Sequence, residues 1–179
     1  TDNGVDRWAA AATTHNWGDA GRRARAEFDL AIVSVLLDAG AGPQWRYHDP
    51  ISGRKIGRSE GLALASLEMF RQGLFSSERG DPWRVDADAL QRLKIVDLNA
   101  GFQVTRDNPM VGIEGRAQLL NSLGEVILSK PEIFALNDTP RPGGVFDRLK
   151  ALASDGKLAT SAILTELLLQ LGRIWPSRY

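Results

Sequence analysis

The sequence of 179 residues contains no cysteine, which excludes disulfide bonds and thiolate metal sites. It has no excess of charge of either sign, since 22 Lys and Arg balance 22 Asp and Glu, which argues against nucleic acid or a membrane surface as the partner. Long hydrophobic runs are also absent, because LAIVSVLL and AILTELLLQL are far shorter than the ~20 residues of a spanning helix. We therefore expect no membrane span and take the cytoplasm as the default compartment.

The composition is that of an ordinary globular protein, with 43% hydrophobic and 25% charged residues. A chain of this length can bury one core, so we expect a single domain over residues 1–179. It starts TDNGVDRW without a methionine, and we expect a processed, trimmed or excised start. Sustained alternation of period two is absent and the helical period dominates, which predicts an all-α fold of about seven to nine helices.

The expected helices follow from apolar residues three or four apart and from capping residues. Asp19, Ser59 and Asp86 are expected N-caps, and Asn108 followed by Pro109 is a further start signal. We expect helices over residues 19–38, 59–72, 86–93, 95–102, from 109 to before Pro131, over 145–153 and over 161–171. The first carries an apolar face of Phe28, Ile32, Val35 and Leu36, and the second one of Leu62, Ala65 and Met69.

The stretch LLDAGAGPQWRYHDP, residues 36–50, joins a helix end to a dense polar and aromatic set. Its Gly-x-Gly lacks the third glycine of a dinucleotide fingerprint and follows a helix, which argues against a Rossmann site. One interpretation is a plain helix C-cap at Gly40. The other is that Asp38 and the polar and aromatic side chains of residues 45–49 form one wall of a binding site.

The loop SGRKIGRSEG, residues 52–61, is rich in cations next to a helix start. It is not a P-loop, because its two glycines are too close together and Arg58 stands where that motif needs lysine. The free amides and the dipole of a helix start favour an anion there, and arginines can grip phosphate bidentately. The alternative is a solvated basic loop with Glu60 as its counter-ion.

The segment DNPMVGIEGRAQLL, residues 107–120, carries Glu114 between Gly112 and Gly115 in an apolar helix. Glu114 is a candidate general acid or base, or the partner of an arginine on another helix. A pair with Arg116 is not expected, because residues two apart lie on different faces of a helix. The two histidines, His15 and His48, lack metal-ligand spacing, and no Gly-x-Ser-x-Gly elbow is present.

Five segments in order, FDLAIVSVLLDAGAGPQWRY, GRSEGLALASLEMFRQGLFS, FQVTRDNPMVGIEGRAQLL, PGGVFDRL and IWPSR, resemble the uracil-catabolism family (Urc/Urg type) of fungi and bacteria. Members of that family are longer, so the resemblance implies that this chain is a central portion of one. The order of EGLALASLEMF, DLNAGF and NPMVGIEGRAQLLNSLGEVI is also similar to the queuosine-salvage N-glycosidases. That fainter likeness implies a DNA-glycosylase-like, helix-hairpin-helix shape.

The resemblance implies hydrolysis of the N-glycosidic bond of a phosphorylated ribosyl-urea intermediate, for which no metal or organic cofactor is required. Such cleavage builds positive charge on the sugar, which a carboxylate can stabilise, and Asp38 and Glu114 are the candidates. For substrate binding we expect phosphate contacts from the helix start and packing against the sugar or urea from the aromatic residues. The candidates are Trp45, Arg46, Tyr47, Arg58, Ser59 and Arg116.

A competing interpretation is a helical module that binds a nucleotide, a nucleic acid or a protein partner without catalysis. The basic loop and the glycine-rich turn support it. Salt separates the two interpretations, because nucleic-acid binding weakens steeply through counterion release whereas a small phosphorylated ligand shows a shallower slope.

Overall fold

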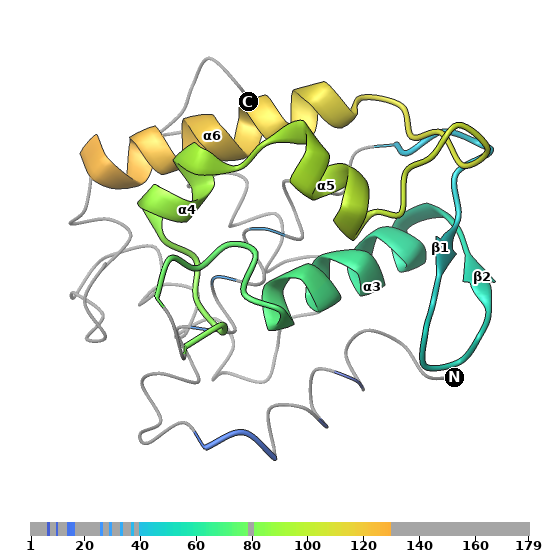
Figure 1. The fold of residues 1–179 in the computed structure, drawn as a ribbon, viewed down its shortest axis with the longest axis horizontal. Helices are drawn as coiled ribbons and strands as arrows, with labels where there is room; N and C mark the ends of the chain where they lie inside the picture. Colours follow the sequence, from blue (N-terminus) through green and yellow to red (C-terminus); the bar gives the residue numbers. More distant parts are fainter. Residues whose placement is uncertain are drawn as a thin grey trace, which may run out of the picture. The chain divides into compact units, whose positions relative to one another are not determined.

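The computed structural model describes residues 7, 10, 14–16, 26, 29, 33, 37, 40–78 and 81–129. This part of the protein is mostly helical, with four continuous helices and one small sheet (Figure 1). In chain order the elements are β1 (Tyr47–His48), β2 (Lys55–Ile56), α3 (Arg58–Arg71), α4 (Ala87–Arg92), α5 (Ile95–Gly101) and α6 (Ile113–Ser129). The mainly helical expectation is confirmed here, whereas the total helix count and the glycosylase-like shape remain predictions.

The chain falls into two compact units, Thr1–Gly124 and Glu125–Tyr179, and nearly all described residues belong to the first. The expectation of a single domain over residues 1–179 remains a prediction. The helices expected over residues 145–153 and 161–171 lie outside the described residues. In the part that the structure describes, no helix has both the length and the apolar character needed to cross a bilayer.

Four described residues of the helix expected over 19–38 are helical and buried: Ala26, Asp29, Val33 and Leu37. Their spacing of three or four residues puts them on one face. The expected cap and apolar face lie outside the described residues: Asp19, Phe28, Ile32, Val35 and Leu36. Asp29 is polar in this core position, and one of its carboxylate oxygens accepts the backbone N–H of Val85 at 3.1 Å.

Helix α3 occupies nearly the residues that the sequence predicts, and its predicted apolar face is buried, at Leu62, Ala65 and Met69. The predicted N-cap is wrong. Gly57 in extended conformation is the N-cap, and Ser59 lies exposed inside the first turn. The reason is that β2 ends at Ile56 and leads directly into the helix, so that the helix begins before Ser59.

Asp86 caps α4 as predicted, since its carboxylate accepts the N–H of Ala89 at 2.9 Å. Helix α5 also lies within its predicted range. The predicted start of the last described helix is wrong, because α6 begins at Ile113 rather than after Asn108. The intervening Gly112 has φ +72, which breaks the helical backbone, and the side chain of Asn108 is bound to the β1 region instead.

The hairpin of β1 and β2 was not predicted. Its strands are antiparallel, with Tyr47 opposite Ile56 and His48 opposite Lys55. The turn closes through the N–H of Asp49, which donates to the carbonyl of Arg54 at 2.9 Å. Strands of two residues are too short to produce a visible alternation in the sequence.

The core of the described residues is mostly apolar and aromatic. β1 and α5 both contact α3 (Figure 1). The side chain of Met69 on α3 lies so close to Gly101 on α5 that a Cβ there would come within 2.1 Å of the sulfur. The largest fully buried side chains are Trp45, Phe70, Phe75, Phe102, Leu37, Leu64, Leu90, Leu98, Leu120 and Leu123.

Candidate functional site

The β1 region separates an exposed set of side chains from a buried set. Arg46 and His48 are exposed, whereas Trp45, Tyr47 and Asp49 are buried. From residue 46 onward this follows the alternation of side chains along an extended strand. In this region a soluble ligand can therefore reach the side chains of Arg46 and His48.

Trp45 anchors this region to the core. It is fully buried, its indole N–H donates to the carbonyl of Phe102 at 2.9 Å, and the two rings pack edge to face. The apolar surface of its ring is thus packed, and its polar N–H group has a hydrogen-bond partner. Binding of a substrate by Trp45 remains a prediction, and it would require the side chain to leave this position.

Arg46 lies against the start of α3. A Cβ built on Gly57 would come within 3.0 Å of the Cδ atom of Arg46 and 3.1 Å of its Nη1. That same nitrogen donates to the carbonyls of Pro43 and Trp45, at 2.8 and 2.7 Å. Glycine at residue 57 thus leaves room for the guanidinium beside the helix N-terminus.

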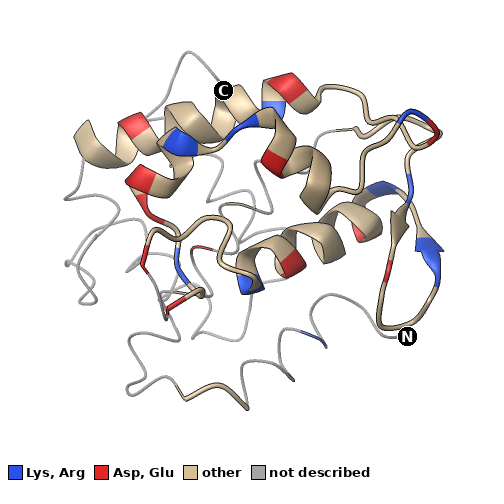
Figure 2. Cartoon of the chain, viewed as in Figure 1, with Lys and Arg blue, Asp and Glu red and all other residues tan. Residues whose placement is uncertain are grey.

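Basic residues gather around the hairpin and the beginning of α3 (Figure 2). Arg54, Lys55 and Arg58 are exposed there, together with Arg46. Arg58 is the first residue of α3 and has φ +57, a left-handed backbone that residues other than glycine rarely adopt. Gly57 offers no side chain to cap the helix, and the partial positive charge of the helix start adds to these cations.

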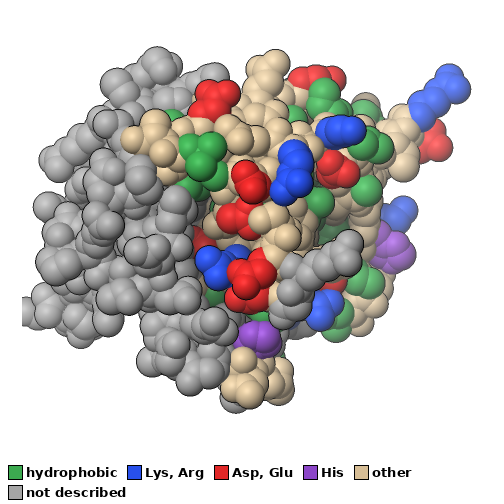
Figure 3. Space-filling view, turned by 60° about the vertical axis from the view of Figure 1, so that its left-hand side comes forward, with side chains coloured by type: hydrophobic (Ala, Val, Ile, Leu, Met, Phe, Trp, Pro, Cys, Tyr) green, Lys and Arg blue, Asp and Glu red, His purple; other side chains and the backbone are tan. Residues whose placement is uncertain are grey.

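The face drawn in Figure 3 is different, because acidic and basic side chains alternate over its described part. One such pair of opposite charges among the described residues joins Arg84 and Glu78, at 2.9 Å. Among the described residues, no three or more His, Cys, Asp or Glu side chains gather in a way that could hold a metal ion.

Asp49 has an environment that the sequence interpretation missed. Its carboxylate is fully buried and accepts both terminal nitrogens of Arg7, at 2.6 and 2.5 Å. It also accepts the N–H groups of Ile51 and Ser52 and the Ser52 hydroxyl. The hydrogen bond from Arg7, with those from Ser52 and Ile51, holds the pKa of Asp49 well below its usual range against the opposing effect of burial.

A local signal for part of this arrangement was available in DPISG, since Asp-Pro followed by Ser and Gly is typical of a turn in which the carboxylate accepts amides further on. Nothing local indicates Arg7, which is 42 residues away.

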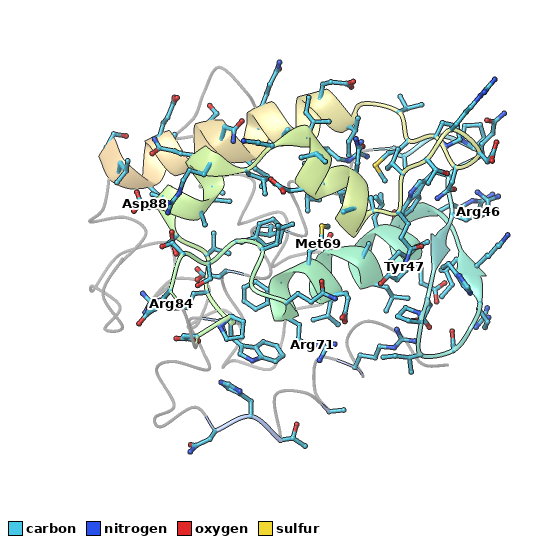
Figure 4. The ribbon with its side chains drawn as sticks, viewed as in Figure 1. Arg46, Tyr47, Met69, Arg71, Arg84 and Asp88 are labelled. Carbon is cyan, nitrogen blue, oxygen red and sulfur yellow. The ribbon has the colours of Figure 1, made fainter. Side chains whose placement is uncertain are left out.

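Tyr47 belongs to β1, and its buried side chain lies beside α3 (Figure 4). Burial, with the negative charges of Glu68 and Asp49, raises the pKa of its phenol to about 12. The Glu68 carboxylate accepts hydrogen bonds from Arg71 at 2.7 and 3.1 Å, which lower its own pKa. Tyr47 is therefore a neutral, buried hydroxyl at ordinary pH, and its predicted contact with substrate remains a prediction.

Glu114 and Arg116 point in different directions. Glu114 is exposed in the first turn of α6, whereas Arg116 is only 3% exposed. Arg116 donates from Nε to the carbonyl of Leu37 at 3.3 Å and from Nη1 to that of Val111 at 2.5 Å. Arg116 thus binds the carbonyl of helical Leu37 and that of Val111, which satisfies part of its buried guanidinium.

Asp38 directly follows Leu37 in the sequence but lies outside the described residues. Its predicted role as a catalytic carboxylate, like that of Glu114, therefore remains a prediction. A Cβ built on Gly115 would meet no described atom within 4 Å, so no close backbone approach explains this glycine within the described residues.

Comparison with known protein families shows to which family the chain belongs. A family model described as "Protein of unknown function (DUF1688)" matches residues 1–179. The chain belongs to this family.

Two curated relatives share much of this DUF1688 sequence. The "Protein urg3" of Schizosaccharomyces pombe is 44% identical over 151 residues, which cover 84% of this chain and 35% of that protein. The "Uracil catabolism protein 4" of Lachancea kluyveri is 38% identical over 146 residues, which cover 81% of this chain and 32% of that protein. The chain thus spans about a third of the length of these DUF1688 relatives. No solved structure matches it.

Proposed function

We propose that this DUF1688 chain forms part of a protein that acts in uracil catabolism, and that it supplies a site for a phosphorylated ribose derivative. The printed name of the relative from Lachancea kluyveri, "Uracil catabolism protein 4", supports the pathway, at 38% identity. The resemblance of the quoted motifs supports a substrate in which urea is attached to ribose phosphate.

The proposed reaction is hydrolysis of the N-glycosidic bond. Water attacks the anomeric carbon, the bond from this carbon to the urea nitrogen breaks, and that nitrogen takes up a proton, which gives ribose phosphate and urea. Positive charge develops on the sugar ring, and Asp38 and Glu114 are the carboxylates proposed to stabilise it and to activate the water. The exposure of Glu114 supports its access to a ligand.

The observation that carries the proposal is the contact between Arg46 and the start of α3. The guanidinium lies beside Gly57, which carries no capping side chain, and exposed Arg58 follows at once. A phosphate there would meet two arginines and the positive end of a helix 14 residues long. The exposed hydroxyl of Ser59 in the same turn is a further proposed contact.

The test is urea release from ribosyl-urea 5′-phosphate by the whole protein. Hydrogen bonds to charged groups contribute about 1.5–3 kcal/mol each, so Arg46→Gln should raise KM about 10- to 100-fold. Asp38→Asn and Glu114→Gln should lower kcat with little change in KM, because they act on charge that develops in the transition state.

Arg92→Gln is the matched control for the arginine variant. Arg92 is also exposed and also donates to a backbone carbonyl, that of Asp88 at 3.1 Å, but it lies in α4 away from the hairpin (Figure 1). Its substitution should leave KM unchanged. Full activity in both carboxylate variants would contradict the proposed chemistry, and an unchanged KM for Arg46→Gln would contradict the phosphate site.

A further inference from the structure

The edge of β1 that does not face β2 is bound by two side-chain amides. Asn108 accepts the backbone N–H of Arg46 through Oδ1 and donates to its carbonyl through Nδ2, both at 2.8 Å. Gln103 does the same for His48, accepting its N–H at 2.7 Å and donating to its carbonyl at 2.9 Å. We call these four hydrogen bonds the amide clamp.

The amide clamp takes the place of a third strand. A side-chain amide carries the same donor and acceptor as a peptide group, and the N–H and C=O groups of alternate residues point to the same edge of a strand. Arg46 and His48 are such alternate residues, so each amide satisfies both polar groups of one of them. A two-stranded hairpin is marginal by itself, and the amide clamp extends its pairing.

The residues of the amide clamp also hold each other. Asn108 donates a further hydrogen bond through Nδ2 to the carbonyl of Gln103 at 2.9 Å. Gln103 has φ +56 and Arg58 has φ +57, and these are the non-glycine residues with left-handed backbone among those described. Strained backbone persists only where its surroundings determine it, and such residues concentrate at ligand-binding sites. Gln103 is held by the amide clamp, and Arg58 follows the glycine against which Arg46 lies.

The guanidinium of Arg46 retains one free edge. Nη1 donates to the carbonyls of Pro43 and Trp45, whereas Nε and Nη2 have no hydrogen-bond partner among the described residues. Those two nitrogens form the side of the guanidinium that binds a phosphate through two parallel hydrogen bonds. Bidentate binding requires a fixed orientation of this edge, which depends on the backbone from which Arg46 extends.

We propose that Asn108 and Gln103 are positioning residues, which hold the backbone of residues 46–48 so that the free edge of Arg46 stays at the start of α3. The phosphate as ligand rests on the proposed function above, but the orientation of Arg46 does not. The amide clamp acts on substrate affinity through Arg46 and touches no reacting atom. Asn108 lies in the segment that leads into α6, the helix that carries Glu114. The amide clamp therefore also connects this segment with Arg46, the residue proposed to bind the phosphate.

The first test needs no ligand. Phenylglyoxal modifies accessible arginines, and peptide mass spectrometry of the whole protein gives a rate for each one. Asn108→Ala should raise the rate at Arg46 several-fold and leave the rate at Arg92 unchanged. An unchanged rate at Arg46 overturns the positioning, whatever the ligand does.

The second test is a double-mutant cycle with ribose 5-phosphate as the probe in calorimetric titrations. In the protein that retains Arg46, Asn108→Ala should weaken binding about tenfold. In the Arg46→Gln protein the same substitution should cause no further loss of affinity. Equal losses in both backgrounds would show that Asn108 does not act through Arg46, which overturns the inference. If the unsubstituted protein fails to bind ribose 5-phosphate while phenylglyoxal modifies Arg46 faster in Asn108→Ala, that combination refutes the phosphate site and supports the positioning of Arg46.

A second variant keeps the test available if Asn108→Ala does not fold. Gln103→Gly removes two hydrogen bonds of the amide clamp but relieves the left-handed backbone, so that part of the destabilisation is offset. It should raise the modification rate at Arg46 in the same direction. Gln118→Ala, at an exposed position of α6, is the matched control and should change neither rate nor affinity.

Discussion

The guanidinium of Arg7 and the carboxylate of Asp49 form a two-point ion pair across 42 residues of sequence, with the carboxylate fully buried. The pair fastens a residue near the start of the chain to the turn of the hairpin that carries Arg46 and His48. Replacing one partner of a buried ion pair by a neutral group is destabilising, because the attraction is lost while the cost of burying the other charge remains.

We expect Asp49→Asn to lower the free energy of unfolding by about 3 kcal/mol. Asp49 has a depressed pKa in the folded protein, so its contribution to stability is fully present above about pH 4, the pKa of an unfolded aspartate. It is lost as the pH falls further towards the folded-state pKa. Urea denaturation at a series of acidic pH values should therefore show a shallower decline for Asp49→Asn than for the unsubstituted protein. Asp107→Asn, at an exposed position, is the control, and an equal decline in all three proteins would contradict the prediction.

Tyr47 should ionise only in strong alkali, because its phenol has a pKa of about 12. The folded state binds this proton more tightly than the unfolded state, whose tyrosine has a pKa near 10. The resulting stability is present below about pH 10 and is lost as the pH rises from there towards 12. Ultraviolet titration should show a late tyrosinate step that Tyr47→Phe removes. Persistence of that step in Tyr47→Phe would show that it belongs to another group.

Gly101→Ala and Gly115→Ala should change stability in opposite directions, although both replace a helical glycine. A Cβ at residue 101 would overlap the sulfur of Met69, and overpacking of this kind costs about 1–3 kcal/mol. A Cβ at residue 115 meets no described atom, so the higher helix propensity of alanine should stabilise by about 0.5–1 kcal/mol. Chemical denaturation of both variants measures the difference.

Coupling with Met69 identifies the cause of the first effect. If the overlap destabilises Gly101→Ala, the loss should be smaller in the Met69→Ala background, where the sulfur is gone. The same loss in both backgrounds would assign it to another contact.

Binding of ribosyl-urea 5′-phosphate should be saturable, one to one, and modestly dependent on salt. Few charges take part at the start of α3, whereas a nucleic acid would release many counterions and lose affinity steeply as salt increases. Calorimetric titration at several salt concentrations, with a single-stranded oligonucleotide in parallel, separates the two. Tight and steeply salt-dependent binding of the oligonucleotide, with no binding of the small phosphate, would favour the binding module without catalysis.

The predictions from sequence that are confirmed concern local interactions. The face of α3, the cap of α4 by Asp86 and the extent of α5 depend on residues within about one helical turn of each other, and such patterns are visible in the sequence. The basic start of α3 was visible for the same reason. Asn108 was misassigned as an N-cap because its type fits a cap, although its partners lie elsewhere.

Tertiary structure decided what those same residues do. Asn108 binds Arg46 across 62 residues, and Gln103 binds His48 across 55. The helical character of the described chain and the charges near α3 follow from the sequence by itself, because periodicity, capping and composition are local properties. Only the fold determines the orientation of Arg46 and the burial of Asp49 and Arg116. Each of these depends on polar groups of distant segments, which need hydrogen-bond partners once they are removed from water.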